Sequence, residues 1–309
     1  MASEHLVFDR SLLTRRRERF AAGAGDHDFL LARVAEDLAW RLSLIKRQFP
    51  LAVNVGAHHG LVSRALRTLP GFEIVIDADL SPSLLAQCDG PVVTADEEML
   101  PFASRSLDLV VSGLALQFVN DLPGALVQIE RSLKPDGLFL AAMLGGQTLT
   151  ELRQALVAAE TETTGGASPR VSPFADVRDL GGLLQRAGFA LPVADSDIVE
   201  VAYPSALELM RDVRGMGAAN VLVERSRKPL RRQTLLRAVE IYQERFARPD
   251  GRVRATFEIL TLTGWSPHAS QQKALRPGSA KSRLADALGV PETGTGEKPE
   301  SVGREGKSR

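Results

Sequence analysis

The chain has 309 residues, enough for one large core or for one core with a smaller subdomain. Lysine plus arginine and aspartate plus glutamate are balanced at 38 each, so no net field attracts nucleic acid or acidic lipid. A single cysteine, Cys88, excludes an intramolecular disulfide framework and zinc sites built from cysteines. No apolar run approaches the roughly 20 residues that cross a bilayer, and we expect a reducing, cytoplasmic setting.

The first 26 residues are rich in arginine and lack the apolar segment of a secretory signal. Four arginines between positions 15 and 19 would suit a transit peptide, but Glu4, Asp9 and Glu18 argue against one. We therefore expect residues 1–26 to form a basic helix or arm whose charged face lies in solvent.

Alternating strands and helices are predicted from residue 27 to residue 165. Residues 27–48 have apolar side chains at helical spacing, and Pro50 should close that helix. A Pro-Asp-Gly turn at 135–137 should lead into the fifth strand. The expected strands are 51–55, 73–78, 91–94, 107–113 and 137–144, and the helices between and after them are 61–69, 81–87, 121–134 and 147–162. This alternation specifies an α/β fold with a parallel sheet and helices on both faces.

The rhythm changes after residue 165. We expect a helix at 176–188, a strand at 197–203, a helical insertion at 205–248 and a last strand at 256–265. The main domain should therefore span 27–264, with a C-terminal extension at 265–309. From about residue 291 the extension should be disordered, because it has too few large apolar groups to offset chain entropy.

The loop after the first strand is a candidate cofactor site. Ligands collect at the carboxyl ends of parallel strands where the strand order reverses, and the first strand ends at Val55. Gly56 allows a positive φ, and Gly60 lets the next helix begin close to a ligand. The N-terminus of that helix would favour a carboxylate or phosphate.

Acidic residues follow the next two predicted strands. Asp79 ends the second strand about 20 residues after the loop, where a carboxylate can accept both ribose hydroxyls. Asp96 follows the third strand and suits an adenine amino group, and the neighbouring Leu80 and Glu97 are assigned to the same pocket. Either acid alone is as well explained as a turn or capping residue, but the ordered set favours an adenosine pocket.

Motifs that the loop lacks reduce the number of cofactor classes that it could bind. It has neither Gly-x-Gly-x-x-Gly, as a dinucleotide site prefers, nor the Gly-Lys-Ser/Thr of a P-loop. Residues 95–143 resemble the stretch from the third to the fifth strand of S-adenosylmethionine-dependent methyltransferases of the seven-stranded class. The resemblance implies S-adenosylmethionine as cofactor and a doubly wound, mostly parallel, Rossmann-like sheet of seven strands.

A closer resemblance covers residues 7 to about 280. Stretches such as FPLAVNVG, LKPDGLFLAAMLGG, YPSALELMRDVRGMG and GWSPHASQQ are similar to the methyltransferase-fold assembly factors of respiratory complex I. The mitochondrial member of that family is known as an arginine hydroxylase, and bacterial members are generally labelled methyltransferases. A more distant relative is the malonyl-carrier-protein methyltransferase of biotin synthesis.

The closer resemblance leaves three functions open: a methyltransferase, an arginine hydroxylase of a complex I subunit, and an inactive assembly chaperone. It implies a protein substrate and no nucleic acid, with a location in the cytoplasm or at the periphery of the inner membrane. Methyl transfer needs mainly an in-line nucleophile, so the lack of an evident catalytic residue is compatible with it.

Two departures from the family pattern concern the cofactor loop and the substrate pocket. Asn54 stands where relatives commonly have aspartate, and His58 replaces the middle glycine. We expect cofactor binding to survive if His58 points away from the cofactor and its φ is negative; otherwise strain of about 1–3 kcal/mol would weaken binding. Gln117 and Phe118 replace a common His-Trp pair, and Gln117 cannot serve as a general base.

Two glycines and two histidines admit alternative interpretations. Gly145 and Gly146, after the fifth strand, would join Gln117 and Phe118 in a substrate pocket, or would form only a flexible turn. His58 and His59 with Asp79 could form the two-histidine, one-carboxylate site of an iron hydroxylase. Because neighbouring residues in a tight loop usually point apart, we expect no metal site.

Overall fold

The computed structural model describes residues 6–272, 286 and 289–291. Residues Met1–Ala269 form one compact unit, and Ser270–Arg309 form a second. The first unit contains all the helices and strands discussed below. The disorder predicted for the end of the chain concerns residues that mostly lie outside the described part.

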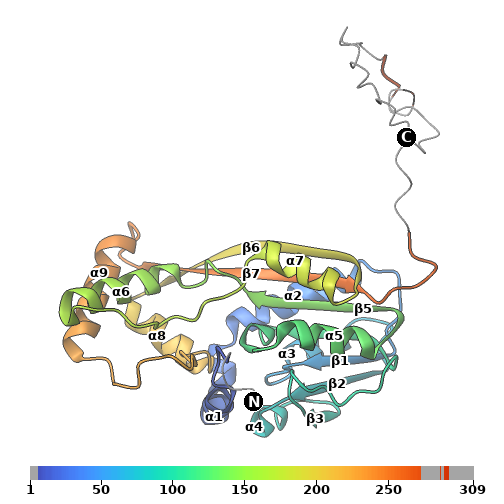
Figure 1. The fold of residues 1–309 in the computed structure, drawn as a ribbon, viewed down its shortest axis with the longest axis horizontal. Coiled ribbons are helices and arrows are strands. Elements are labelled where there is room, and N and C mark those ends of the chain that lie inside the picture. Colours follow the sequence, from blue (N-terminus) through green and yellow to red (C-terminus); the bar gives the residue numbers. More distant parts are fainter. Residues whose placement is uncertain (1–5, 273–285, 287–288, 292–309) are drawn as a thin grey trace, which may run out of the picture. The chain divides into compact units, whose positions relative to one another are not determined.

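A seven-stranded sheet runs through the first unit (Figure 1) in the order β3-β2-β1-β4-β5-β7-β6. Strands β1 to β5 pair in parallel, and β7 runs antiparallel to both of its neighbours. The strands are β1 Leu51–Val55, β2 Ile74–Asp79, β3 Val92–Thr94, β4 Leu107–Gly113, β5 Leu133–Leu144, β6 Ala190–Tyr203 and β7 Val253–Trp265. The predicted fold class is confirmed, and the strand order reverses between β1 and β4.

Helices cover both faces of the sheet because alternate strand residues point to opposite sides. One core contains Ala52 of β1 with side chains of α2, α3, α6 and α9; the other contains Val53 with side chains of α5 and α7. The helices are α1 Arg10–Phe20, η1 Ala21–His27, α2 Phe29–Ser43, α3 Leu61–Arg67, α4 Pro82–Leu85, η2 Leu116–Phe118, α5 Leu122–Ser132, α6 Thr150–Thr164, α7 Val177–Arg186, α8 Ala206–Gly215 and α9 Arg232–Phe246. Helices α8 and α9 lie between β6 and β7, where a helical insertion is predicted.

Three predicted boundaries differ from the structure. The helix predicted at 27–48 spans only Phe29–Ser43, because the 3-10 helix η1 occupies the preceding turn. Strand β5 begins at Leu133, before the predicted Pro-Asp-Gly turn; the turn residues form a bulge between the pairs at Leu133 and Leu138, with φ +68° at Asp136. Strand β6 begins at Ala190 because its pairing with β7 extends over nearly its whole length.

No helix in the described part of the chain is both long and apolar enough to span a membrane.

Candidate active site

The loop between β1 and α3 packs tightly against the strand ends around it. Gly56 has φ +66°, and a Cβ built there would lie 2.0 Å from the Cβ of Ala115. Gly60 has φ +82°, and its Cβ would lie 3.1 Å from Sγ of Cys88. Close approach and left-handed φ therefore require both glycines.

Asn54 lies in a buried polar cluster between β1, β2 and α3. Its Nδ2 donates hydrogen bonds to Oγ of Ser63 and to Oδ1 of Asp77, both at 3.0 Å. The side chain is fully buried, and its Oδ1 accepts no hydrogen bond from the described residues. Asn54 thus anchors the loop's first strand to α3 and β2.

The carboxylate of Asp79 faces the loop. Its Oδ2 accepts the backbone N–H of His58 at 3.0 Å, and its Oδ1 accepts that of Ser81 at 2.9 Å. Asp79 has no exposed surface, whereas Leu80 is half-buried. Ser81 caps α4 by accepting from the N–H of Leu84, with Pro82 at the first position, as its sequence predicts.

Arginines of α1 contact the acids that were assigned to adenosine. Nη1 of Arg17 lies 3.6 Å from Oδ2 of Asp79 and 3.6 Å from Oε1 of Glu97. Nη2 of Arg10 lies 2.7 Å from Oδ1 of Asp96 and also pairs with Glu97. Any hydroxyl that reaches Asp79 from this side must therefore compete with a guanidinium.

The prediction that the basic face of α1 lies in solvent is wrong for Arg17, of which only 4% is exposed. Arg10, Leu13, Arg17 and Phe20 recur at helical spacing along one side of α1. That stripe was the available signal, but its arginines are buried by acids more than 60 positions away, which periodicity alone does not reveal.

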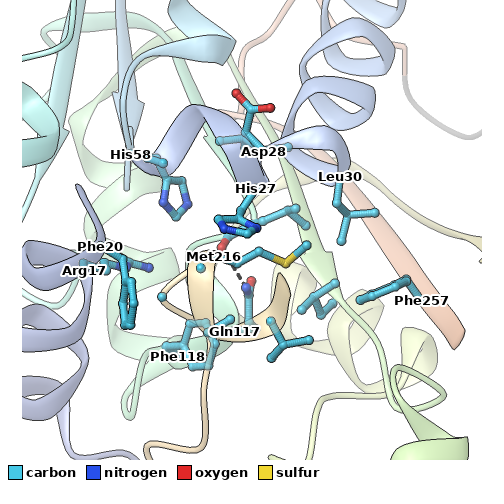
Figure 2. A pocket seen from close by; sticks show the side chains of 18 of the residues that line it. Arg17, Phe20, His27, Asp28, Leu30, His58, Gln117, Phe118, Met216 and Phe257 are labelled. Atoms are coloured by element: carbon cyan, nitrogen blue, oxygen red, sulfur yellow. Dashed lines mark hydrogen bonds between the residues drawn. The ribbon is translucent and has the colours of Figure 1, made fainter. Parts of the chain in front are cut away.

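A largely apolar cavity with a volume of about 100 Å³ lies beside these acids (Figure 2). Its polar lining includes Arg17, His27, His58 and Gln117. Apolar walls come from Phe20, Leu30, Leu31, Leu144, Leu149, Met216 and Phe257. Arg17 and His58 contact Asp79 and also line the cavity, so they join the cavity to the proposed cofactor site.

Gln117 and Phe118, predicted for the substrate pocket, both line this cavity. Nε2 of Gln117 donates to the carbonyl of Leu114 at 2.7 Å. Phe118 is buried and makes edge-on ring contacts with Phe8 and Phe174. The two side chains therefore differ in use: Phe118 fixes the wall, and Gln117 presents a polar atom.

Gly145 and Gly146 are not among the described residues that line this cavity. A Cβ at Gly145 would lie 2.6 Å from the carboxyl carbon of Glu258, whose Oε2 accepts the N–H of Gln147 at 2.8 Å. The turn is thus packed around a carboxylate of the same chain. Gly146 borders a separate surface cavity that includes Arg153 and Phe174.

His58 adopts the left-handed conformation, with φ +52°. The condition of a negative φ is therefore not met, and strain of about 1–3 kcal/mol is expected. The ring lines the cavity, and burial lowers the pKa of His58 to about 3, with further lowering by Arg17 and His59. The imidazole is neutral at physiological pH.

The two neighbouring histidines have different partners. Nε2 of His59 lies 3.0 Å from Oδ2 of Asp28, whereas the backbone of His58 binds Asp79. Across the described residues, no group of three or more histidine, cysteine or acidic side chains has the arrangement to hold a metal ion. The structure does not bring His58, His59 and Asp79 together as metal ligands.

Sequence reasoning missed a series of hydrogen-bonded side chains that includes His27 of the cavity lining. Nδ1 of His27 lies 2.6 Å from Oδ1 of Asp212, and the hydroxyl of Tyr203 donates to Oδ2 at 2.6 Å. Burial, followed by the bond to Asp212, raises the pKa of Tyr203. His27 packs against Gly215, so these hydrogen bonds tie η1 to α8 at the cavity wall, which both residues line. Isolated residues so far apart in sequence give no motif.

Comparison with known proteins agrees with this geometry. A family model described as a methyltransferase domain matches residues 53–141. The chain is 44% identical over 292 residues to "Arginine-hydroxylase NDUFAF5, mitochondrial" of Danio rerio, covering 91% of this chain and 89% of that protein. It is 43% identical over 284 residues to the Homo sapiens protein of the same name, covering 89% and 81%. The chain belongs to the family of the NDUFAF5 arginine hydroxylases.

The chain is also similar to a group of methyltransferases. The chain is 35% identical over 284 residues to a malonyl-[acyl-carrier protein] O-methyltransferase of Methylovorus, covering 87% of this chain and 93% of that protein. A solved methyltransferase-like structure from Bacillus halodurans superposes with a TM-score of 0.53 at 17% identity, over 75% of this chain and 99% of the other. That likeness concerns the fold alone. The protein is an enzyme of the methyltransferase fold, and proteins of this fold generally bind S-adenosylmethionine.

Proposed function

We propose that this protein hydroxylates an arginine side chain of a respiratory complex I subunit. The names of its relatives support the reaction, and the resemblance to complex I assembly factors supports the substrate. The structural observation that supports a joined cofactor and substrate site is the link between Asp79 and the apolar cavity. His58 donates its backbone N–H to Asp79 while its ring lines that cavity.

We propose S-adenosylmethionine as the cofactor at the ends of β1, β2 and β3. Asp79 and Glu97 are buried carboxylates able to accept ribose hydroxyls, and Asp96 suits the adenine amino group. The left-handed glycines of the loop allow a close approach of the backbone. When bound, the cofactor would supply a sulfonium charge and an electrophilic methyl group, which serve methyl transfer. Hydroxylation replaces a C–H bond by C–OH, so it would also need dioxygen as the oxygen source and a two-electron reductant, with water as the second product.

The chain's residues have separate parts in this proposal. The loop and Asp79 would orient the cofactor, and the apolar walls would exclude water and hold the aliphatic part of an arginine side chain. The hydrogen bonds from Tyr203 through Asp212 to His27 would hold η1 against α8 at the cavity wall. These parts serve hydroxylation and methyl transfer equally.

Methyl transfer to a protein substrate is the second candidate. The similarity to malonyl-[acyl-carrier protein] O-methyltransferases favours it, as does the neutral imidazole of His58, since positioning of a nucleophile supplies most of the rate. An inactive chaperone is the third possibility that the family resemblance raises, and it requires no turnover.

Intact-mass comparison of complex I subunits separates these functions. Cells lacking the gene would be complemented with wild type, with Asp79→Asn, or with Asp89→Asn as an exposed acid-to-amide control. We expect a gain of one oxygen on an arginine with wild type and the control, and none with Asp79→Asn. A gain of one methylene would instead establish the second candidate. Restored assembly without any mass change would leave the chaperone function.

A further inference from the structure

Unpaired polar atoms of the cavity are the starting point. Nε2 of His58, Oε1 of Gln117 and Nη1 of Arg17 are buried and have no hydrogen-bond partner among the described residues. All three side chains line the same cavity, and Figure 2 shows His58 and Gln117 directed into it from different elements. Buried polar groups without partners are costly, so each of these atoms suits a ligand.

The partners of the first two atoms limit what they can bind. The carbonyl of Leu114 accepts from Nε2 of Gln117 at 2.7 Å, which leaves the amide oxygen Oε1 as the atom free to accept. A neutral imidazole carries a lone pair on one of its two nitrogens, so Nε2 of His58 can accept from a ligand when the proton is on Nδ1. In that tautomer the cavity offers two hydrogen-bond acceptors.

A charged cluster borders the cavity at Arg17, which lines it, whereas the acids of the cluster do not. Arg10 and Arg17 lie within 4 Å of four carboxylates, so this cluster has two net negative charges. Its acids are Asp79, Asp96, Glu97 and Glu98. These acids offset the charge that Arg17 brings to the cavity wall, so a cationic ligand that donates several N–H bonds is compatible with it.

We propose that Gln117 and His58 form a specificity site that accepts the N–H groups of the substrate's guanidinium. Leu30, Leu144 and Phe257 supply apolar wall for the aliphatic stem. This inference rests on the proposed arginine substrate, and it assigns recognition of the arginine to Gln117 and His58. Gln117 would bind the substrate through a hydrogen bond, a role for which a side chain need not act as a general base.

The test uses small probes and measures binding without turnover. N-acetyl-arginine methylamide is compared by calorimetry with the citrulline and norleucine analogues, using the full chain. We expect the arginine probe to bind about tenfold more tightly than the citrulline probe, since one or more charge-assisted bonds are lost in citrulline. The ¹⁵N resonance of His58 Nε2 should also move when the arginine probe is added.

Variants identify the residues. Gln117→Leu should reduce the preference for arginine over citrulline about tenfold, and Gln117→Glu should increase it. Gln154→Leu, an exposed glutamine on α6, is the matched control and should leave the preference unchanged. Thermal melting of each variant shows whether it folds.

Two results would overturn the assignment: an arginine probe that binds no better than citrulline to wild type, or a preference that Gln117→Leu leaves intact with the His58 resonance unmoved. The intact-mass comparison of complex I subunits tests the proposed reaction independently of this binding site. A selective cavity in a protein that adds nothing to complex I would contradict the proposed reaction and leave this site in place.

Discussion

Replacing Arg17 with alanine tests whether α1 competes with a nucleoside ligand. The guanidinium lies 3.6 Å from the carboxylates of both Asp79 and Glu97, in a residue that is 4% exposed. Ribose hydroxyls that donate to Asp79 would have to replace this contact. We therefore expect Arg17→Ala to bind S-adenosylhomocysteine more tightly than wild type.

The expected gain follows from the ion pairs. Coulomb's law at this distance and an effective dielectric constant of about 20 gives roughly 4–5 kcal/mol for each pair. Desolvation of the guanidinium cancels most of this, leaving a net contribution on the order of 1–2 kcal/mol. The Kd for S-adenosylhomocysteine should fall by roughly five- to thirtyfold. The free energy of unfolding should also fall by about 3 kcal/mol, because two buried carboxylates lose a partner.

Isothermal titration calorimetry measures the affinity, and chemical denaturation measures the stability. Arg16→Ala is the matched control on the same helix: Nη1 of Arg16 donates to the carbonyl of Asn220 at 2.6 Å, and its affinity should equal that of wild type. If Arg17→Ala binds S-adenosylhomocysteine equally or more weakly while Arg16→Ala is unchanged, Arg17 is no competitor and the reasoning is refuted.

Three further predictions concern stability. Gly215→Ala should lower the free energy of unfolding by about 1–3 kcal/mol in thermal melts, because its Cβ would lie 2.0 Å from the ring of His27; an unchanged melting temperature would contradict that packing. Glu258→Gln should cost about 0.5–1.5 kcal/mol in urea, since the bonds to Gln147 N–H and Ser196 Oγ lose their charge assistance, while the amide can still accept from Gln147 N–H and donate to Ser196 Oγ. The pKa of His58 is lowered from 6.5 to about 3, so between these pH values the unfolded state binds more protons than the folded state. The free energy of unfolding should therefore be highest above pH 6.5 and fall by up to about 2 kcal/mol by pH 5. His58→Asn, which tolerates a positive φ, should lack that loss in urea titrations at the two pH values.

The sheet was predictable because buried parallel strands are continuous apolar runs separated by helices of a different period. The same logic placed Asp79 at the carboxyl end of β2, one strand from the switch point between β1 and β4. The start of β5 at Leu133 was not predictable in this way, because it depends on the pairing of Leu133 with Leu107 of β4. The predicted turn residues lie between that pair and the next at Leu138, with Asp136 at φ +68° and backbone hydrogen bonds linking Asp136 and Gly137 to Ser266, so local turn chemistry persists as a bulge inside the strand.

The candidate site was predictable only where its residues follow strands. Gln117 was expected in the pocket and lines the cavity, but the role of its free Oε1 depends on Leu114, a neighbour with no polar side chain. Arg17 and His27 come from α1 and η1, whose contacts with the sheet and α8 are long-range. When these long-range contacts are unknown, the sequence shows only a basic helix and an isolated histidine.

The backbone of His58 gives a physical reason to regard its ring as functional. Glycine would adopt φ +52° without strain and would still donate its N–H to Asp79, so neither the loop geometry nor that hydrogen bond requires a side chain. What histidine adds is an imidazole that stays neutral and ends in an unpaired Nε2 at the cavity. Backbone strain and a buried atom without a partner both cost free energy, and they occur together in one residue. A ligand that donates to Nε2 would recover the second of these costs, which is why we assign the substrate to this cavity.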